Sequence, residues 1–449
     1  MLLIIDYNLS RVADVAHMRD RARHHHGADT ILIRANPGNA DARLCDHLIA
    51  VDPLAHDFVD RAYEALTPWL SHICGGVVFS DNAVRSGAAL LERIGVKVDS
   101  AALALGAFSK LEYRRCEARC HDLFASQRVL APDCVSIDSL DELRSFSQLH
   151  PEGFVVKPSC EGNNRGVVLV QPGDDLPRVF DEVAPYLAAG VICEQLIPYQ
   201  REFSFDGVGG LSFATEKVSA AGRYPVEVAQ VVPARITQSA YETLRRAGEL
   251  ANWLVGQRDG PFHNEVKLSD DGMFGAVVEP NRRPAGMRIW TLAALVYGVD
   301  FYHLWVDSVL GNESKPSGLK PTCQAATVML GVKRDRWFAP SDLASGDELF
   351  QATLRQTARR YGLNEDVLRP IEFSWLSLER RRVPSVPRDN SDFVAHACIT
   401  LHALDCDIGE IVSGLREDWS AALEKAAFSE LSTDSDVMHQ TGDQARVGV

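Results

Sequence analysis

Apolar residues in the first hundred positions of the chain fall into short runs that are separated by longer segments. The runs include LLIID, TILIR, HLIAVD and GVVFS, and the segments near residues 12–25, 58–70 and 84–94 have the periodicity of amphipathic helices. This alternation predicts a parallel β-sheet that is covered by helices on both faces. No G-x-G-x-x-G follows the first strand, which disfavours a dinucleotide-binding oxidoreductase.

A second pattern, between residues 262 and 280, has the period of β-strands. Two segments with alternating apolar residues are joined by Asp-Asp-Gly, which favours a hairpin turn. If Glu265 and Glu279 point to one face of this hairpin, they lie side by side, and Asn281 and Arg283 emerge on the same face. Carboxylate and carboxamide oxygens, without Cys or His, suit Mg²⁺. The alternative interpretation is a solvated hairpin whose acidic residues face water.

A third pattern is a loop rich in glycine and asparagine between two apolar strands. It lies in GFVVKPSCEGNNRG, residues 153–166, and the strand VVLV follows it. Glycine and asparagine accept left-handed backbone angles, so successive N–H groups can point into one concavity and bind phosphate oxygens. Lys157, at the end of the first strand, would add a positive charge to the same phosphates. The loop alone is also compatible with an ordinary hairpin turn.

The hairpin and the loop together resemble motifs of the ATP-grasp superfamily of carboxylate–amine ligases. Three more features occur in the order of that family: FSK, which ends at Lys110; EQLI, which starts at Glu194 and precedes Glu202; and E-x-N-x-R, which starts at Glu279. The resemblance covers about residues 105–310 and is greatest to the L-amino-acid (dipeptide-forming) ligases. It implies an α/β protein with an N-terminal Rossmann-like sheet, a two-subdomain ATP-grasp core of α+β character and a C-terminal α+β closing subdomain.

The resemblance also implies which residues bind the nucleotide and its metal. Those implied for ATP are Lys110, Lys157, Ser159, Gly162, Asn163, Asn164, Gly166, Glu194, Gln195, Leu196, Ile197 and Glu202. Glu265, Glu279 and Asn281 would hold one or two Mg²⁺ ions, which Mn²⁺ could replace. In the family, the two lysines reach the phosphates, residues 194–197 receive the adenine, and the position of Glu202 binds the ribose. The connection before Glu202 departs from the family because it lacks the frequent glycine.

A substrate site is implied by the stretch at residues 220–236. The dipeptide-forming ligases carry a similar stretch with a glutamate that contacts the substrate's ammonium group, and Glu227 matches it. Gln230 stands where several of those enzymes have histidine, so the preferred amino acid stays open. Arg283 is the candidate catalytic residue because a planar guanidinium fits both a carboxylate and a tetrahedral intermediate. Gly286 completes the substrate motif. An alternative interpretation of Glu227 is that it only caps a helix or forms an ion pair.

The implied reaction is ATP-dependent amide formation between small-molecule carboxylate and amine substrates, expected to be amino acids. The carboxylate would attack the γ-phosphate to give an acyl phosphate and ADP, and the amine would then displace phosphate. Two alternatives stay open, namely an ATP-grasp carboxylase-type enzyme that activates bicarbonate and a catalytically inactive ATP-binding regulator. Similar proteins also lead us to expect a homodimer.

Five segments are expected along the chain. They are an N-terminal Rossmann-like domain (1–105), an ATP-grasp subdomain with the phosphate loop (106–190), an ATP-grasp subdomain with the metal site (191–315), a closing subdomain (316–428) and a disordered tail (429–449). The tail is predicted because the composition becomes polar after a last helix at about residues 407–428.

Composition limits the possible partners and the location of the protein. The 449 residues carry a net charge of −15, which argues against a nucleic-acid partner. No apolar run approaches the ~20 residues that span a bilayer. The first strand lacks the basic region of a signal peptide. The ten cysteines form no C-x-x-C pair. A cytoplasmic enzyme without a membrane partner is therefore expected. His24, His25 and His26 are interpreted as a solvated helix end, because adjacent side chains on a helix splay apart.

Overall fold

The computed structural model of the chain describes residues 1–8, 11–162, 165–220, 224, 226–312 and 318–440, with side chains as far as residue 426. The chain forms two compact units, Met1–Lys217 with Val232–Pro321 and Val218–Val231 with Thr322–Val449. The first unit contains every residue predicted to bind nucleotide or metal, and the second contains Glu227 and Gln230. The boundaries of the five predicted segments stay a prediction.

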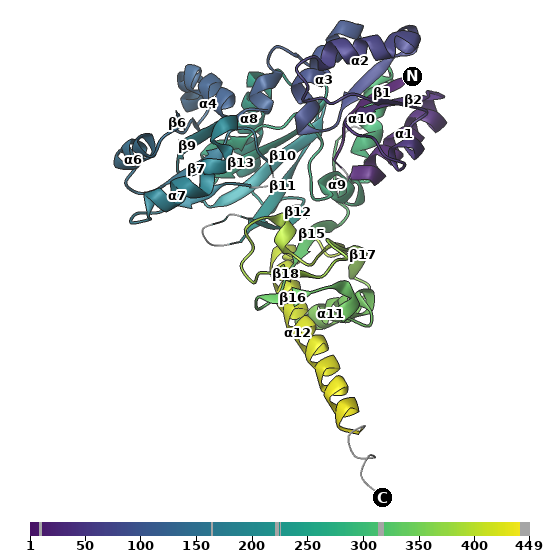
Figure 1. Cartoon of the computed structure of the whole chain (residues 1–449), viewed down its shortest axis with the longest axis vertical. Coiled ribbons are helices and arrows are strands. Elements are labelled where there is room, and N and C mark those ends of the chain that lie inside the picture. Colours follow the sequence, from purple (N-terminus) through teal and green to yellow (C-terminus); the bar gives the residue numbers. More distant parts are fainter. Residues whose placement is uncertain (9–10, 163–164, 221–223, 225, 313–317, 441–449) are drawn as a thin grey trace, which may run out of the picture. The chain divides into compact units, whose positions relative to one another are not determined.

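The first hundred residues form the predicted parallel sheet with its helices (Figure 1). The strands are β1 (Leu2–Ile5), β2 (Thr30–Arg34), β3 (His47–Ala50) and β4 (Gly75–Val78), and the helices are α1 (Val12–His26), α2 (Phe58–Leu66) and α3 (Val84–Ile94). The strand order is β3-β2-β1-β4, and each neighbouring pair is parallel. Apolar side chains of the strands are buried against α2 and α3. Helix α1 ends at Gly27, where glycine accepts the left-handed backbone.

The next part of the first unit begins with two helices and continues as an antiparallel sheet. α4 (Lys110–Arg119) starts at Ser109, whose side chain accepts from the N–H of Glu112, and α5 (His121–Ser126) and β5 (Val129–Leu130) follow. The sheet consists of β6 (Cys134–Ile137), β7 (Phe154–Pro158), β8 (Val168–Val170) and β9 (Val191–Gln195), in the order β6-β9-β7-β8. α6 (Leu140–Leu149) and α7 (Leu176–Val183) share its apolar core. The predicted phosphate loop connects β7 to β8.

The predicted Asp-Asp-Gly hairpin lies at the centre of the remaining strands of the first unit. These strands are β10 (Arg201–Val208), β11 (Leu211–Ser219), β13 (Pro261–Leu268) and β14 (Gly275–Glu279), and their order, with β5 at the end, is β11-β10-β13-β14-β5. Gly272 in the turn has a φ of 69°, a left-handed angle that favours glycine. α8 (Gln238–Leu254) buries its apolar face against these strands, and α9 (Ile289–Tyr297) and α10 (Phe301–Val309) follow the hairpin.

The second unit combines strands with two long helices. Its strands are β12 (Glu227–Val232), β15 (Gln324–Leu330), β17 (Leu368–Trp375) and β19 (Ala395–Leu401), in the order β17-β19-β15-β12, and β16 (Arg336–Phe338) pairs with β18 (Arg381–Val383). α11 (Gly346–Arg360) and α12 (Ile408–Gln440) pack around the buried Trp419. α12 extends to Gln440, and the predicted disordered tail stays a prediction. Residues 441–449 lie outside the described part of the chain.

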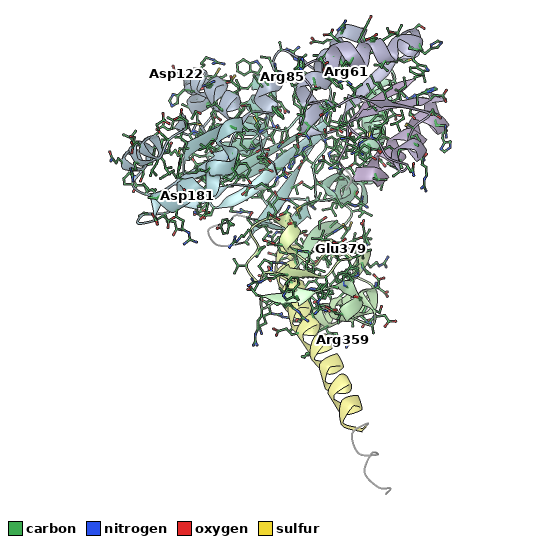
Figure 2. The ribbon with its side chains drawn as sticks, in the orientation of Figure 1. Arg61, Arg85, Asp122, Asp181, Arg359 and Glu379 are labelled. Carbon is green, nitrogen blue, oxygen red and sulfur yellow. The ribbon has the colours of Figure 1, made fainter. Side chains whose placement is uncertain are left out.

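Figure 2 shows the side chains of both units and labels six charged ones, all exposed: Arg61, Arg85, Asp122, Asp181, Arg359 and Glu379. Within the described ranges, no single helix has the length and apolar character needed to cross a membrane. α9 and α10 reach that apolar character only when they are counted together across a sharp bend, and both contribute buried core residues.

Candidate functional site

Two carboxylates lie side by side on adjacent strands, as the alternation in the hairpin predicts. Glu265 in β13 and Glu279 in β14 are register partners next to a β-bulge. Lys110 Nζ, at the start of α4, is 2.6 Å from Glu279 Oε2, and Lys217 Nζ, on β11, is 2.9 Å from Glu265 Oε2. We call Lys110, Lys217, Glu265 and Glu279 the carboxylate cluster. The side chains of Lys110 and Glu279 keep 13% and 23% of their surface exposed, so a ligand can reach them.

Lys217 is a member of this cluster that the sequence patterns did not single out. Its Nζ is also 2.7 Å from Glu202 Oε1, and Glu202 and Lys217 are register partners on β10 and β11. One lysine therefore joins the predicted ribose-binding residue to the predicted metal ligand Glu265. The available signal was a lysine inside a predicted strand, since a buried lysine needs an acidic partner.

The donor atoms of the carboxylate cluster fit a hard cation. Glu265 and Glu279 supply carboxylate oxygens, the donor type that Mg²⁺ and Mn²⁺ prefer. Burial would raise the pKa of Glu265, but Lys217 and His263 lower it well below its usual range. This carboxylate stays ionised, as a metal ligand must. The ammonium groups of Lys110 and Lys217 show that positive charge at this place is compatible with the fold.

His263 and Asn281 hold the end of the hairpin and orient Glu265. The N–H of His263 donates to Asn281 O at 2.9 Å, and Asn281 Nδ2 donates to His263 O at 3.1 Å. His263 Nδ1 is 2.6 Å from Asp206 Oδ1, and its Nε2 is 3.4 Å from Glu265 Oε1. Burial lowers the pKa of His263, but Asp206 and Glu265 raise it to about 9. The spacing H-x-E, which puts both side chains on one strand face, could have drawn attention to His263.

Arg283 pairs with a carboxylate from the N-terminal sheet. Its Nε donates to Asp81 Oδ1 and Oδ2 at 2.7 and 2.8 Å, and Asp81 lies just beyond the end of β4. The guanidinium is thus placed to hold a carboxylate, and its role toward a substrate stays a prediction. A Cβ at Gly286 would have no neighbour within 4 Å. Packing inside this unit therefore does not require glycine there, and its predicted contact with substrate also stays open.

The phosphate loop contacts the start of α4. The N–H of Lys110 donates to Ser159 O at 2.9 Å, and Lys110 Nζ donates to Glu161 O at 2.8 Å. The hydroxyl groups of Ser109 and Ser159 are 2.9 Å apart. These contacts bring Lys110 and the loop after β7 together, as a common phosphate site requires.

The glycines of the loop differ in their surroundings. Gly166 has a φ of 70°, and a Cβ there would lie 2.6 Å from the ring of Tyr186, so both the backbone and the packing require glycine. A Cβ at Gly162 would meet open space. Asn163 and Asn164 lie outside the described residues, so their predicted contact with phosphate stays a prediction.

Lys157 pairs with a different carboxylate, inside a buried group of charges. Its Nζ is 3.0 Å from Glu194 Oε1, and Glu194 Oε2 accepts from Arg114 Nε at 2.7 Å. Arg114 NH1 donates to Glu117 Oε2 at 2.6 Å, and its NH2 donates to Val277 O on β14 at 2.8 Å. We call Arg114, Glu117, Lys157 and Glu194 the buried arginine cluster. It fixes α4 to the strand that carries Glu279.

The pKa values of the two carboxyl groups in this buried cluster are strongly shifted. Burial would raise the pKa of Glu194, but Arg114 and Lys157 lower it to about 2. Burial raises the pKa of Glu117 to about 7, although Arg114 opposes the shift. Both oxygens of Glu194 have cationic partners, so this residue holds Lys157 in place, and its predicted contact with adenine stays a prediction.

The predicted adenine segment follows Glu194 directly. The N–H of Gln195 donates to Asp133 O at 2.8 Å, and its Oε1 accepts from the N–H of Asp133 at 3.2 Å. Leu196 and Ile197 leave the strand, and the side chain of Ile197 is buried. The backbone of this segment is therefore held at one end, which suits recognition of a flat base by main-chain groups.

Glu227 and Gln230, the remaining predicted substrate residues, both lie on β12 of the second unit. Gln230 Nε2 donates to Glu227 Oε2 at 2.9 Å. This contact joins the two side chains, while their roles toward an amino acid stay predictions.

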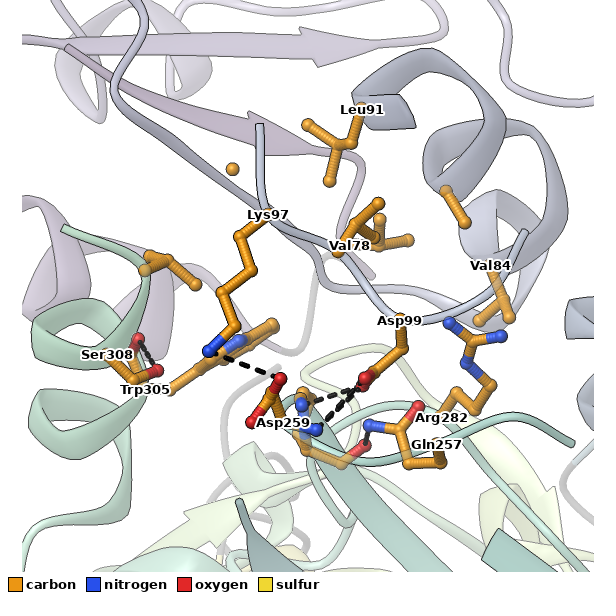
Figure 3. A pocket seen from close by; sticks show the side chains of 16 residues that line it. Val78, Val84, Leu91, Lys97, Asp99, Gln257, Asp259, Arg282, Trp305 and Ser308 are labelled. Atoms are coloured by element: carbon orange, nitrogen blue, oxygen red, sulfur yellow. Dashed lines mark hydrogen bonds and ion pairs between the residues drawn. The ribbon is translucent and has the colours of Figure 1, made fainter. Parts of the chain in front are cut away.

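A cavity at another place opens where the N-terminal sheet meets the start of β13 (Figure 3). Apolar side chains line one part of its wall and polar ones another, among them Val78, Val84, Leu91, Lys97, Asp99, Gln257, Asp259, Arg282, Trp305 and Ser308. The N–H groups of Asp259 and Gly260 donate to Asp99, which ties the linker after α3 to this region. None of the predicted site residues lines this cavity, so it does not mark the place where they converge.

Comparison with known proteins gives similarity at the level of structure. No family model matches the chain, and no curated protein matches it. The L-amino acid ligase from Bacillus licheniformis is similar with a TM-score of 0.70 and 17% identity, over 93% of this chain and 97% of that one. The N5-carboxyaminoimidazole synthetase from Staphylococcus aureus complexed with ADP is similar with a TM-score of 0.62 and 15% identity, over 93% of this chain and 96% of that one.

A third similar structure is the biotin carboxylase domain dimer of the 2-oxoglutarate carboxylase from Hydrogenobacter thermophilus, in complex with MgADP, ADP and bicarbonate. Its TM-score is 0.57 and its identity 13%, over 89% of this chain and 85% of that one. At such low identities these similarities establish a shared fold.

Proposed function

Because this chain has the ATP-grasp fold, we propose that it is an ATP-dependent carboxylate–amine ligase that joins amino-acid-like substrates. The observation that carries the proposal is the carboxylate cluster, in which Lys110 contacts both Glu279 and the loop after β7. A lysine placed between an acidic pair and a phosphate loop is what a magnesium–nucleotide complex needs. A solvated hairpin would instead leave Glu265 and Glu279 facing water.

The residues of the site would share the work of binding. Glu265, Glu279 and Asn281 would hold Mg²⁺, which when bound neutralises phosphate charge and orients the γ-phosphate. Lys110 would bind phosphate oxygens, and Lys157 would do the same from β7. Phosphoryl transfer needs little covalent help from a protein, so positioning and charge compensation supply most of the rate enhancement.

The proposed reaction has two steps. An oxygen of the substrate carboxylate attacks the γ-phosphorus, the bond to the bridging oxygen breaks, and ADP leaves an acyl phosphate behind. The nitrogen of the second substrate attacks the acyl carbon, phosphate leaves, and the nitrogen loses a proton. Arg283, whose guanidinium holds the Asp81 carboxylate in the structure, would steady the substrate carboxylate and then the tetrahedral intermediate. The loop over residues 158–166 would exclude water from the acyl phosphate.

A second candidate is an enzyme that activates bicarbonate. The similar carboxylase domain, which is described with MgADP and bicarbonate, favours this candidate. The resemblance of the stretch around Glu227 to the dipeptide-forming ligases supports the amino-acid ligase instead.

A phosphate-release screen would test the proposed function directly. The full chain, with ATP and Mg²⁺, would be incubated with pairs of amino acids, with single amino acids and with bicarbonate, and the products would be identified by mass spectrometry. We expect ADP release that depends on particular amino acids, with a dipeptide as the product. Release that needs only bicarbonate would establish the second candidate, and ATP binding without ADP release in every arm would indicate a regulator. The Glu279→Gln variant is the control for contaminating ATPases.

A further inference from the structure

Helix α1 packs against α10 (Figure 1). Three metal-ligand side chains of this region lie close together. His17 comes from the middle of α1, His303 from the first turn of α10, and Asp300 is the N-cap of α10. His17 Nε2 is 2.5 Å from Asp300 Oδ2, and His303 Nδ1 is 3.8 Å from the same oxygen. The ligand atoms all lie within 4.8 Å of one another. We propose that these three side chains bind one divalent transition-metal ion of the zinc type, which joins α1 to α10.

The donor atoms and their spacing suit such an ion. Two imidazole nitrogens with one carboxylate oxygen favour Zn²⁺, Co²⁺ or Ni²⁺, whereas Mg²⁺ prefers oxygen alone. Bonds of 2.0 to 2.2 Å place the ligand atoms of a tetrahedral ion about 3.3 Å apart. The separations of 2.5 and 3.8 Å lie on either side of that value, so small side-chain rotations suffice. The side chains of His17, Asp300 and His303 are 44%, 30% and 32% exposed, which lets an ion enter and water complete its coordination.

The carboxylate and the imidazoles are already oriented toward one another. Asp300 Oδ1 accepts from the N–H of His303 at 3.0 Å, as an N-cap does, and Oδ2 faces the imidazoles. The rings of His17 and His303 are stacked with their centroids 4.3 Å apart, so one ring would turn out of the stack to direct its nitrogen at a shared ion. Supporting hydrogen bonds of this kind raise the affinity of metal ligands.

A neighbouring group on the same two helices offers a contrast. Asp307 accepts from Arg21 Nε and NH2 at 2.9 and 2.6 Å and also contacts His26 Nε2 at 2.7 Å. A guanidinium already balances the charge of that carboxylate, and it cannot be displaced without leaving an arginine unpaired. Asp300 has imidazoles as its side-chain partners, and these become ligands when an ion replaces their protons.

The helix that carries His17 also reaches the segment after the metal motif. Arg11, at the N-cap of α1, donates from NH1 to Ala285 O at 2.8 Å and from NH2 to Tyr302 OH at 2.8 Å. An ion between α1 and α10 would therefore stabilise the packing that positions residues 283–286. Its proposed role is structural, and the ion takes no part in phosphoryl transfer.

Cobalt is the probe for the experiment because its visible absorption reports coordination by imidazole. The full chain would be freed of metal with a chelator. It would then be titrated with Co²⁺ in the presence of excess Mg²⁺, which would fill the proposed magnesium site of the carboxylate cluster. We expect one equivalent of Co²⁺ to give d–d absorption bands, and Zn²⁺ to abolish them by competition. His17→Ala and His303→Ala should each weaken Co²⁺ binding at least tenfold. His24→Ala, an exposed residue on the same helix outside both groups, should bind as the unaltered chain does.

Thermal unfolding supplies the second measurement. Zn²⁺ should raise the Tm of the unaltered chain and of His24→Ala, and leave the Tm of His17→Ala and His303→Ala unchanged. The metal-free variants must first give the circular dichroism spectrum of the unaltered chain. Absence of d–d bands from the unaltered chain, or equal Co²⁺ affinity in all the variants, would overturn the proposal.

Discussion

The carboxylate cluster and the buried arginine cluster contain the same kinds of side chain, two acids and two bases each, but the first includes an ion pair that is partly exposed. In the first, Lys110 and Glu279 are 13% and 23% exposed, whereas in the second Arg114 and Glu194 are 2% and 3% exposed. Helix α4 supplies one base to each cluster, Lys110 and Arg114, one turn apart. A partly exposed ion pair can exchange one partner for a ligand more easily than a buried one. A buried pair that loses a partner keeps an uncompensated charge, so the Arg114–Glu194 pair serves as scaffold.

The largest effect should follow from changing the accessible carboxylate. Glu279→Gln removes a charge that the proposed Mg²⁺ site requires, and we expect ADP formation to fall by about 10²–10³-fold. The fold should survive, because glutamine keeps the shape and the position is partly exposed. Steady-state ADP release and thermal unfolding would be measured together. Undiminished turnover would remove the metal assignment.

The buried cluster should respond through stability. Arg114→Met leaves Glu194 and Glu117 without their arginine, and we expect the free energy of unfolding to fall by about 3–5 kcal/mol. Urea denaturation followed by circular dichroism would measure it. The matched control is Arg115→Met on the same helix, whose side chain is 55% exposed. This control should stay within about 0.5 kcal/mol of the unaltered chain, and equal losses in both variants would contradict the contrast between the clusters.

The free energy of unfolding should depend on pH through His263, the residue whose charge supports Glu265. His263 has a pKa of about 9 in the folded chain and 6.5 as its ordinary value. Its protonated form therefore stabilises the fold fully below about pH 6.5, and this contribution is lost as the pH rises through 9.

We expect the loss to be of the order of 3 kcal/mol. Denaturation curves of the unaltered chain and of His263→Gln between pH 6 and 10 would show it as a steeper decline in the former. Parallel curves would mean that His263 is not a buried cation.

The smallest structural effect is expected at Gly286. A Cβ there has no neighbour within 4 Å, so Gly286→Ala should change the free energy of unfolding by less than about 0.5 kcal/mol. If substrate approaches this backbone as the motif predicts, the KM for substrate should rise about tenfold. This change corresponds to a loss of about 1.4 kcal/mol in binding free energy. An unchanged KM would exclude Gly286 from the substrate site.

Periodicity along the chain was enough to predict the N-terminal parallel sheet and the central hairpin. Alternating runs predict the parallel sheet, and the fold implied by the ATP-grasp motifs is confirmed. Glu265 and Glu279 could be paired from sequence because a strand has a period of two and a short turn sets the register.

The amino-acid sequence by itself determined the local elements and the side-chain chemistry that each one carries. Only the tertiary structure decided which charges meet, because Lys217 with Glu265, Arg114 with Glu194 and His17 with Asp300 are brought together by packing between distant segments. A local pattern reports which face of an element a side chain occupies. It contains no information about the partner that a different helix or strand places opposite that face, and that partner decides whether a charge is scaffold or site.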